Sequence, residues 1–284
     1  MSRQQVQRVV IVSLAIGALI LALLTIAASI LLIDWLTSPP MDDGITIESD
    51  SDFRKQNFPG SGTIEDPYII SGVHSKKKWE GIAVRGTTRY FVITDCTFTE
   101  CHEGIRVEDV APGTAQIMNN AIRNGYAPEV GPQAGIVVEY CDSVLIVNNT
   151  ISLAGIYGIY GYGSEACAIY NNTISYHIDG IEVEDCLSSI IANNTLYQNN
   201  NAINCYRSDL VTITDNNCDK NDYRGITVVD SDFALISRNQ CLAESGIGVG
   251  NGIELGFSNN STVSYNEIDN YEYGIRAFGT FFCR

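Results

Sequence analysis

Two glutamates stand two positions apart in the segment GIEVED. In an extended strand, alternate side chains share a face, so Glu182 and Glu184 project together while Ile181 and Val183 project the other way. Strand geometry then places the two carboxyl groups roughly 6–7 Å apart. Inverting glycosidases need about 6.5–9.5 Å between one protonated and one ionised carboxyl group. The pair, with Asp185 beside it, is therefore a candidate for catalysis.

The same carboxylates allow two other interpretations. Asp179, Glu184 and Asp185 offer oxygen ligands of the kind that Ca²⁺ takes, so the cluster could hold this ion. Outward carboxylates on a strand can also form nothing more than a solvated face. The residue types leave all three interpretations open, and Ca²⁺ is the one cofactor that they suggest.

Aromatic and polar residues occupy equivalent positions in the neighbouring segments. Tyrosine combines an apolar ring with a polar tip, which suits contact with sugar rings. Two insertions, 124–134 and 242–251, are expected on the rim of the same face, and long loops on a rigid scaffold often carry binding. We expect a shallow groove between them, lined by Tyr160, Tyr162, Glu182, Glu184, Asn204 and Tyr206, with Arg207 beside it.

These positions are equivalent because the chain repeats itself. One column is asparagine at steps of 22 to 29 residues, with Cys96 in the first slot, followed by Asn120, Asn149, Asn172, Asn194, Asn216, Asn239 and Asn266. A second column is Gly-Ile, with Ala202 filling the one gap among Gly81, Gly104, Gly135, Gly158, Gly180, Gly225, Gly252 and Gly274. Such regular self-similarity is typical of a solenoid.

Each unit contains strand-like runs and nothing with helical periodicity. A repeat of 22–23 residues made of strands around one apolar interior predicts a parallel β-helix of about nine coils. A leucine-rich repeat has a similar length but requires leucine where this chain has Ile and Val. Asparagine tolerates the left-handed conformation of sharp turns, and amides stacked at ~4.8 Å can bond one another.

The N-terminal region differs from the repeats. Residues 9–33 form a run of 25 without a charge, which is long enough to span a bilayer and longer than the apolar core of a cleaved signal. We expect a cytoplasmic segment (1–8), a single-pass signal-anchor (9–33), a linker (34–58) and a β-helix (59–284) that is extracellular or periplasmic.

The outer part of the chain is strongly acidic. After residue 33 there are 33 acidic residues and 15 Lys or Arg, which leaves a net charge of −18. This balance argues against nucleic acid as a partner. It suits cations or neutral glycans, or a solvated exterior.

The GI-x-V and NNT repeats, together with the opening segment GSGTIEDPYII, resemble the right-handed parallel β-helix superfamily over residues 60–284. Its founders are pectate-lyase-like, and the closer resemblance is to the NosD-like subfamily. The resemblance implies a right-handed coil. Family members include polysaccharide lyases, hydrolases, epimerases, adhesins and a periplasmic protein linked to copper-site maturation, so the fold does not select a function.

The family's catalytic signatures N-T-D, G-H-G and D-P-H-E are absent, and Arg207 is the sole nearby candidate for a lyase-like arginine base. Three histidines, His74, His102 and His177, fall in different units, so a copper role depends on the resemblance alone. The favoured function is a cell-surface module for carbohydrate binding or structural interaction. The alternatives are a polysaccharide lyase or glycoside hydrolase, and a NosD-like maturation factor.

Three further expectations concern single positions. Cys218 and Cys241 occupy one inward column in adjacent coils and could form a disulfide, whereas the other cysteines are expected to be small buried hydrophobes. The last Gly-Ile strand lacks a polar cap, so we expect a partner chain or further coils to cover it. N-x-[ST] glycosylation motifs begin at Asn148, Asn171, Asn193, Asn259 and Asn260.

Overall fold

The computed structural model describes residues 44–123, 134–152, 155–244 and 250–284. The predicted membrane span, 9–33, lies outside these ranges. Within them, no helix is both long and apolar enough to cross a bilayer.

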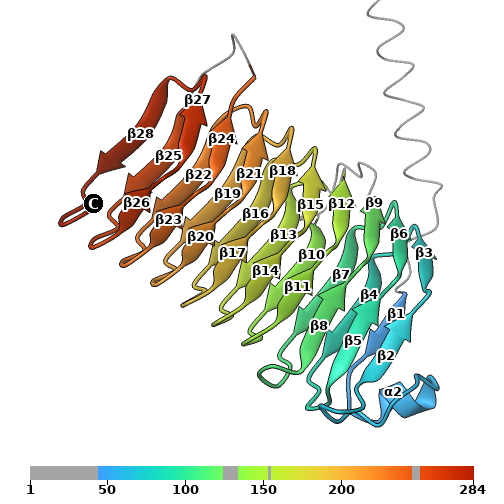
Figure 1. Cartoon of the computed structure of the whole chain (residues 1–284). Coiled ribbons are helices and arrows are strands. Elements are labelled where there is room, and N and C mark those ends of the chain that lie inside the picture. Colours follow the sequence, from blue (N-terminus) through green and yellow to red (C-terminus); the bar gives the residue numbers. More distant parts are fainter. Residues whose placement is uncertain (1–43, 124–133, 153–154, 245–249) are drawn as a thin grey trace, which may run out of the picture. The chain divides into compact units, whose positions relative to one another are not determined.

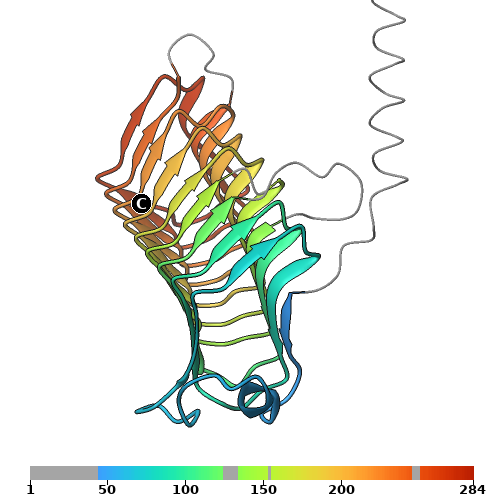
Figure 2. The ribbon, with the colours of Figure 1, turned by 90° about the vertical axis from the view of Figure 1, so that its right-hand side faces the viewer.

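The described chain winds into a solenoid of three parallel sheets (Figures 1 and 2). Sheet A has ten strands: β1 (Ile45–Ile47), β4 (Glu80–Arg85), β7 (Glu103–Glu108), β10 (Ala134–Glu139), β13 (Tyr157–Tyr162), β16 (Asp179–Glu184), β19 (Asn201–Tyr206), β22 (Arg224–Val229), β25 (Asn251–Gly256) and β28 (Tyr273–Phe278). Sheet B has nine: β2 (Tyr68–Ser71), β5 (Phe91–Thr94), β8 (Ala115–Met118), β11 (Leu145–Val147), β14 (Ala168–Tyr170), β17 (Ile190–Ala192), β20 (Thr212–Thr214), β23 (Leu235–Ser237) and β26 (Thr262–Ser264). Sheet C also has nine: β3 (His74–Lys76), β6 (Thr97–Thr99), β9 (Ala121–Arg123), β12 (Thr150–Ser152), β15 (Thr173–Ser175), β18 (Thr195–Tyr197), β21 (Asn217–Asp219), β24 (Gln240–Leu242) and β27 (Glu267–Asp269). The predicted all-β parallel solenoid is confirmed.

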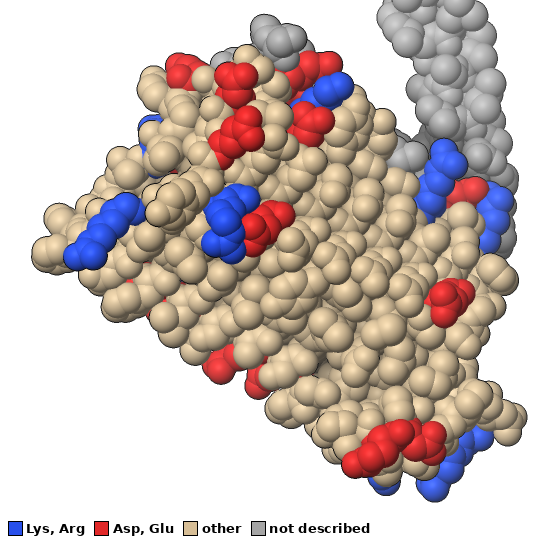
Figure 3. Space-filling model, viewed as in Figure 1, with Lys and Arg blue, Asp and Glu red and all other residues tan. Residues whose placement is uncertain are grey.

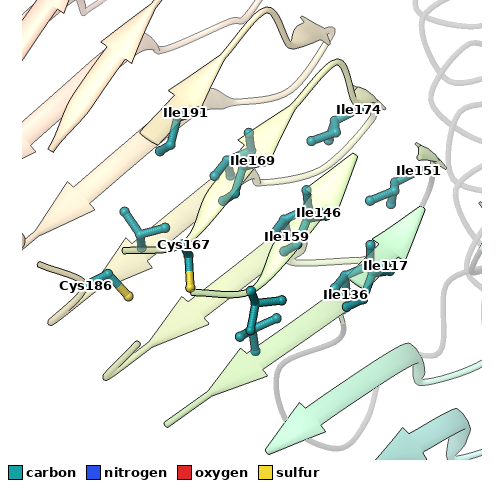
Figure 4. Close-up of a cluster of buried hydrophobic side chains, with 14 of the residues drawn as sticks. Ile117, Ile136, Ile146, Ile151, Ile159, Cys167, Ile169, Ile174, Cys186 and Ile191 are labelled. Atoms are coloured by element: carbon teal, nitrogen blue, oxygen red, sulfur yellow. The ribbon is translucent and has the colours of Figure 1, made fainter. Parts of the chain in front are cut away.

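The core consists of apolar columns that run along the solenoid. Figure 4 shows Ile117, Ile146, Ile169 and Ile191, from successive strands of sheet B, stacked in one such column. All four are buried, and each fully buried isoleucine contributes roughly 1.5–3 kcal/mol of transfer free energy. The in-register pairing of neighbouring strands keeps identical side chains in contact from coil to coil.

The asparagine column forms a continuous chain of amide hydrogen bonds. Asn149 Nδ2 donates to Asn172 Oδ1 at 3.0 Å, and the backbone N–H of Asn149 donates to the same oxygen at 2.9 Å. The pattern recurs from Asn120 to Asn266. The left-handed residue of each turn is the one before, such as Asn171 with φ of 54°. The double asparagine therefore has two separate roles, the first in the turn and the second in the ladder.

A second column combines thiols and hydroxyls at the turn that follows sheet A. Ser208 Oγ accepts the backbone N–H of Cys186 at 3.0 Å and donates to the carbonyl of Tyr206 at 2.8 Å. In successive coils, the equivalent side chain accepts a backbone N–H group from the coil before it. These side chains are Cys141, Ser164, Cys186, Ser208, Ser231 and Ser258. All nine cysteines are free thiols, including Cys218 and Cys241, which are register partners in adjacent strands.

The predicted linker, 34–58, ends earlier than expected. β1 pairs with β4, and the short helix α2 (Asp52–Lys55) lies beside the first coil, where Phe53 is fully buried. The ring of Phe53 stacks on Tyr68 with centroids 4.6 Å apart and lies 5.7 Å from Phe91. This segment has no repeat motif, so the repeat pattern could not reveal that it covers the first coil.

Candidate functional site

The Gly-Ile column determines which side chains reach the outer face of sheet A. A Cβ added to Gly180 would lie 2.7 Å from the carbonyl oxygen of Ala202 and 2.7 Å from Leu196 Cδ2, so this position faces the interior. Ile181 is buried in the core as well. Because two successive positions face inward, Asp179 and Glu182 both face outward, side by side.

The residue before each glycine therefore belongs to the outer face, which strict alternation does not predict. Neighbouring coils share the arrangement: Arg106 Nε donates to Glu103 at 2.7 Å, and the rings of Tyr157 and Tyr160 stack at 4.8 Å. The sequence analysis missed this column. Its residues are Glu80, Glu103, Ala134, Tyr157, Asp179, Asn201, Arg224, Asn251 and Tyr273. Its largely polar composition was the signal that could have identified it.

Asp179 and Glu182 form the centre of the site. Asp179 Oδ1 accepts hydrogen bonds from Asn201 Nδ2 at 2.7 Å and Asn204 Nδ2 at 2.6 Å. Burial raises the pKa of Asp179, against the effect of these two amides. Burial and then the charge of Asp179 raise the pKa of Glu182 to about 7, although hydrogen bonds from Asn204 and Tyr157 oppose the shift. Glu182 is therefore partly protonated at neutral pH.

Next to this centre lies a group of buried polar atoms without hydrogen-bond partners among the described residues. Their strands are β19, β22 and β25, which are adjacent in sheet A. Thr227 and Asn204 are only 1% and 2% exposed. An unsatisfied buried polar group costs about 1–3 kcal/mol of stability. A cluster of such groups is therefore typical of a surface that binds a polar ligand. The atoms are Asn201 Oδ1, Asn204 Oδ1, Thr227 Oγ1 and Asn251 Oδ1. Arg224 Nε also lacks a hydrogen bond but forms an ion pair with Glu254 Oε2 at 3.8 Å.

Tyrosines border the same centre on β13 and β19. Tyr157 and Tyr160 are the register partners of Asp179 and Glu182. Burial, followed by the charge of Glu182, raises the pKa of Tyr157 to about 12, so its hydroxyl stays protonated. Tyr160 donates a long hydrogen bond to Glu184 at 3.5 Å, and burial raises the pKa of Tyr206.

Two of the predicted groove residues have other contacts. Tyr162 packs edge-on against Tyr140, with ring centroids 5.4 Å apart. Arg207 donates to Asp185 at 2.9 and 3.1 Å and also to Glu184. Asp185 lies in the turn after β16 with φ of 53°, where this ion pair holds it.

The predicted calcium ligands are not brought together. Asp179 is held by Asn201 and Asn204, whereas Glu184 and Asp185 share Arg207. Within the part of the chain that the structure describes, no group of three or more His, Cys, Asp or Glu could hold a metal ion. The structure therefore gives no support to Ca²⁺ on Asp179, Glu184 and Asp185, which stays a prediction, because Asp179 lies at the start of β16 and the other two lie at its end.

The histidines occupy unrelated places. The ring of His102 stacks on Trp79 with centroids 4.0 Å apart, and His74 is exposed on β3. Burial lowers the pKa of His177 to about 4, and its backbone N–H donates to Asn199 Oδ1. These positions supply no support for a copper site.

Charge on sheet A is divided into two regions. In the N-terminal region, Arg106 lies 2.7 Å from Glu103 and 2.6 Å from Glu139, and Arg85 bonds Glu80 and Glu108. In the central region, no Lys, Arg or His of the described segments lies within 4 Å of a carboxylate oxygen of Asp179 or Glu182. The central acids thus form no ion pair among the described residues, although the charge of Arg224 acts on Asp179 and opposes part of the effect of burial on its pKa. Most of the two predicted rim insertions, 124–133 and 245–249, lies outside the described residues.

A family model described as "Right handed beta helix region" matches residues 42–174 and 134–282. No curated protein matched the sequence. A double mutant of the periplasmic alginate epimerase AlgG has 14% sequence identity and a TM-score of 0.51, with 84% of this chain and 67% of that chain covered.

Two other solved structures are similar. The enzymatically active domain of tailspike protein 2 from bacteriophage CBA120 has 10% identity and a TM-score of 0.50, with 80% of this chain and 38% of that chain covered. DFA-IIIase from Arthrobacter chlorophenolicus A6 has 15% identity and a TM-score of 0.46, with 66% and 49% covered. This chain spans about half the length of the latter, and identities this low indicate a shared fold alone.

Proposed function

The chain belongs to the family of right-handed β-helix regions, and on that premise we propose that it is a carbohydrate-binding module displayed at the cell surface. The observation that carries the proposal is the cluster of unpartnered polar atoms beside tyrosine rings on sheet A. Sugars need both kinds of contact, because their hydroxyl groups donate and accept while their C–H faces pack on aromatic rings.

The similar structures support the ligand class. AlgG is an alginate epimerase, which acts on a polysaccharide. The charge-free run 9–33 supports display at the membrane, with the β-helix on the extracellular or periplasmic side. Protease added to intact cells should then degrade the β-helix, and complete protection would contradict this location.

A glycan array with the full chain in detergent micelles tests binding. Wild type should bind at least one glycan, and Asn204→Ala, Thr227→Ala and Tyr160→Ala should each weaken that binding at least fivefold. Tyr170→Ala is the matched control, because Tyr170 is a partly exposed tyrosine on sheet B. Equal binding by all variants would remove sheet A as the site, and absence of binding to any glycan would refute the proposal.

A second candidate is glycoside hydrolysis, which one observation favours. Glu182, with a pKa of about 7, can donate a proton at neutral pH, while Arg207 stabilises the negative charge of Glu184. The two carboxylates then match the acid and the ionised partner of a glycosidase. Release of reducing ends from an oligosaccharide, abolished in Glu182→Gln, would establish this activity.

The lyase alternative lacks this support. A lyase-like arginine must give up its proton, but the hydrogen bonds of Asp185 and Glu184 raise the pKa of Arg207. An arginine held in this way is a poorer base than a free one.

A further inference from the structure

We propose that the sugar bound against Asp179 and Glu182 carries a protonated amino group, so that the ligand is an amino-sugar glycan. The proposal extends the carbohydrate-binding function and depends on it. Its basis is the match between an ammonium group and three properties of this centre: its hydrogen-bonding atoms, its charge and its aromatic border.

The hydrogen-bonding atoms of the centre are mainly acceptors. Asp179 and Glu182 present carboxyl oxygens, and Asn201 and Asn204 direct their Nδ2 donors to Asp179, which leaves both Oδ1 atoms unpartnered. Thr227 Oγ1 adds another unpartnered oxygen. An ammonium has three donors and no acceptor, so it is complementary to this set, whereas a neutral hydroxyl supplies a single donor.

Among the described side chains neither Asp179 nor Glu182 forms an ion pair, although the nearby charge of Arg224 opposes part of the rise that burial causes in the pKa of Asp179. Arg106 neutralises Glu103 and Glu139 in the N-terminal region, and Arg207 neutralises Glu184 and Asp185. Asp179 and Glu182 have amide and phenol partners instead. Because a buried charge is costly unless it is paired, a bound cation would stabilise both carboxylates in their ionised form.

The aromatic border favours an organic cation over a metal ion. Tyr157 and Tyr160 lie on the adjacent strand, in register with the two acids and about 4.8 Å away. Rings on this neighbouring strand are in a position to contact a sugar bound at the two acids and to attract an ammonium through cation–π interaction. A uronate would meet the like charges of Asp179 and Glu182, because these two acids, unlike Glu184 and Glu254, form no ion pair with an arginine.

The experiment compares glycans that differ at the amino group. Isothermal titration of the full chain uses glucosamine trimer, N-acetylglucosamine trimer and galacturonate trimer, each in EDTA. The glucosamine trimer should bind at least tenfold more tightly than the other two. Equal or tighter binding of the N-acetylated trimer would overturn the amino-group inference and leave glycan binding intact, whereas binding of none of a broad glycan panel would overturn both.

A matched control is essential because the chain carries a net charge of −16 and acidic side chains gather on its surface, for example over β24 and β27 in Figure 3. Such a surface attracts any cation weakly. Asp179→Asn/Glu182→Gln should abolish the preference for glucosamine, while Glu65→Gln/Glu272→Gln, which removes two exposed carboxylates elsewhere, should retain it. Equal loss in both double variants would reduce the effect to net charge and overturn the site.

Two further measurements keep the test decisive if the double variant does not fold. The single variants Asp179→Asn and Glu182→Gln, each verified by thermal unfolding, should each lower glucosamine affinity at least threefold. In an otherwise wild-type chain, Thr227→Val should lower the affinity for the glucosamine trimer without raising the affinity for the N-acetylated trimer. Unchanged glucosamine affinity in all three folded single variants would contradict the proposal.

Discussion

Glu182 is a residue whose proton affinity depends strongly on its surroundings. Its pKa rises from 4.5 to about 7 because burial and the neighbouring Asp179 penalise the charged form. The folded state therefore binds this proton more tightly than the unfolded state does, and folding loses stability as the pH rises from about 4.5 to about 7. At neutral pH the perturbed carboxyl group therefore lowers the stability of the folded state.

The first prediction is that Glu182→Gln removes this pH dependence. Its free energy of unfolding should exceed that of wild type at pH 8 by on the order of 2 kcal/mol, since the glutamine has no charge to desolvate and solvent screens part of the effect at this partly exposed position. At pH 4 the two proteins should be nearly equal. Urea unfolding at several pH values measures the difference, and parallel curves for both proteins would show that Glu182 is not perturbed.

At the scale of the strand and its turns, glycine and asparagine have tasks that depend on position. The column of Gly-Ile glycines is packed against the backbone of the next coil, as Gly180 is against Ala202. The ladder asparagine is buried and bonded on both sides, while the residue before it is exposed and left-handed. Two residues of one type, side by side, should therefore respond differently to substitution.

The second prediction concerns the glycine column. In Gly180→Ala the new Cβ would lie 2.7 Å from a backbone carbonyl oxygen, so the strand must shift. Overpacking of this kind costs about 1–3 kcal/mol. The matched change, Ala202→Gly, relieves no contact and should cost about 0.5–1 kcal/mol through backbone entropy. Chemical unfolding compares the two, and a smaller loss for Gly180→Ala would contradict the prediction.

The third prediction separates the two asparagines of one turn. Asn172→Ala removes the acceptor of Asn149 Nδ2 and of its backbone N–H, and leaves the carbonyl of Ile146 without its Asn172 donor. At about 1–3 kcal/mol for an unsatisfied group, the loss should be at least about 3 kcal/mol. Asn171→Gly should be within about 1 kcal/mol of wild type, because glycine adopts the left-handed conformation freely. Equal losses for both variants would contradict the assignment of separate roles.

The repeat period allowed most features of the strands and turns to be predicted from the sequence. It identified the inward Ile and Val columns, the asparagine column and the outward positions of Glu182, Glu184 and Asn204. It could not identify the outward position of Asn201 or Arg224, because two successive inward residues interrupt the alternation at each Gly-Ile. Nor could it reveal the ion pairs of Arg207, which depend on side-chain directions in the turn.

At the scale of the whole β-helix, the strands of each coil pair with those of the neighbouring coils, so stability is approximately a sum of coil and interface contributions. Ends matter most in such an assembly. Phe53 fills the end beneath the first coil, a feature outside the repeats that their pattern does not encode. Opening should accordingly begin at a weakened end and spread inward.

The fourth prediction is a local effect of Phe53→Ala. Loss of this buried ring should destabilise the first coils by about 3–5 kcal/mol. Hydrogen exchange should accelerate in β2 and β5, while β16 and β19 keep the protection of wild type. Uniform acceleration throughout the described sheets would instead indicate that the solenoid opens as a single unit.

The buried thiols have a consequence for how such opening can be observed. Eight of the nine cysteines are buried, and they lie in coils distributed from Cys96 to Cys241. Burial raises the pKa of Cys167 to about 12, so in the closed coil this thiol is both shielded and unreactive. In each coil that contains a buried cysteine, alkylation of the thiol can therefore begin only when that coil opens. The order in which the thiols become alkylated would record the route by which the solenoid unwinds.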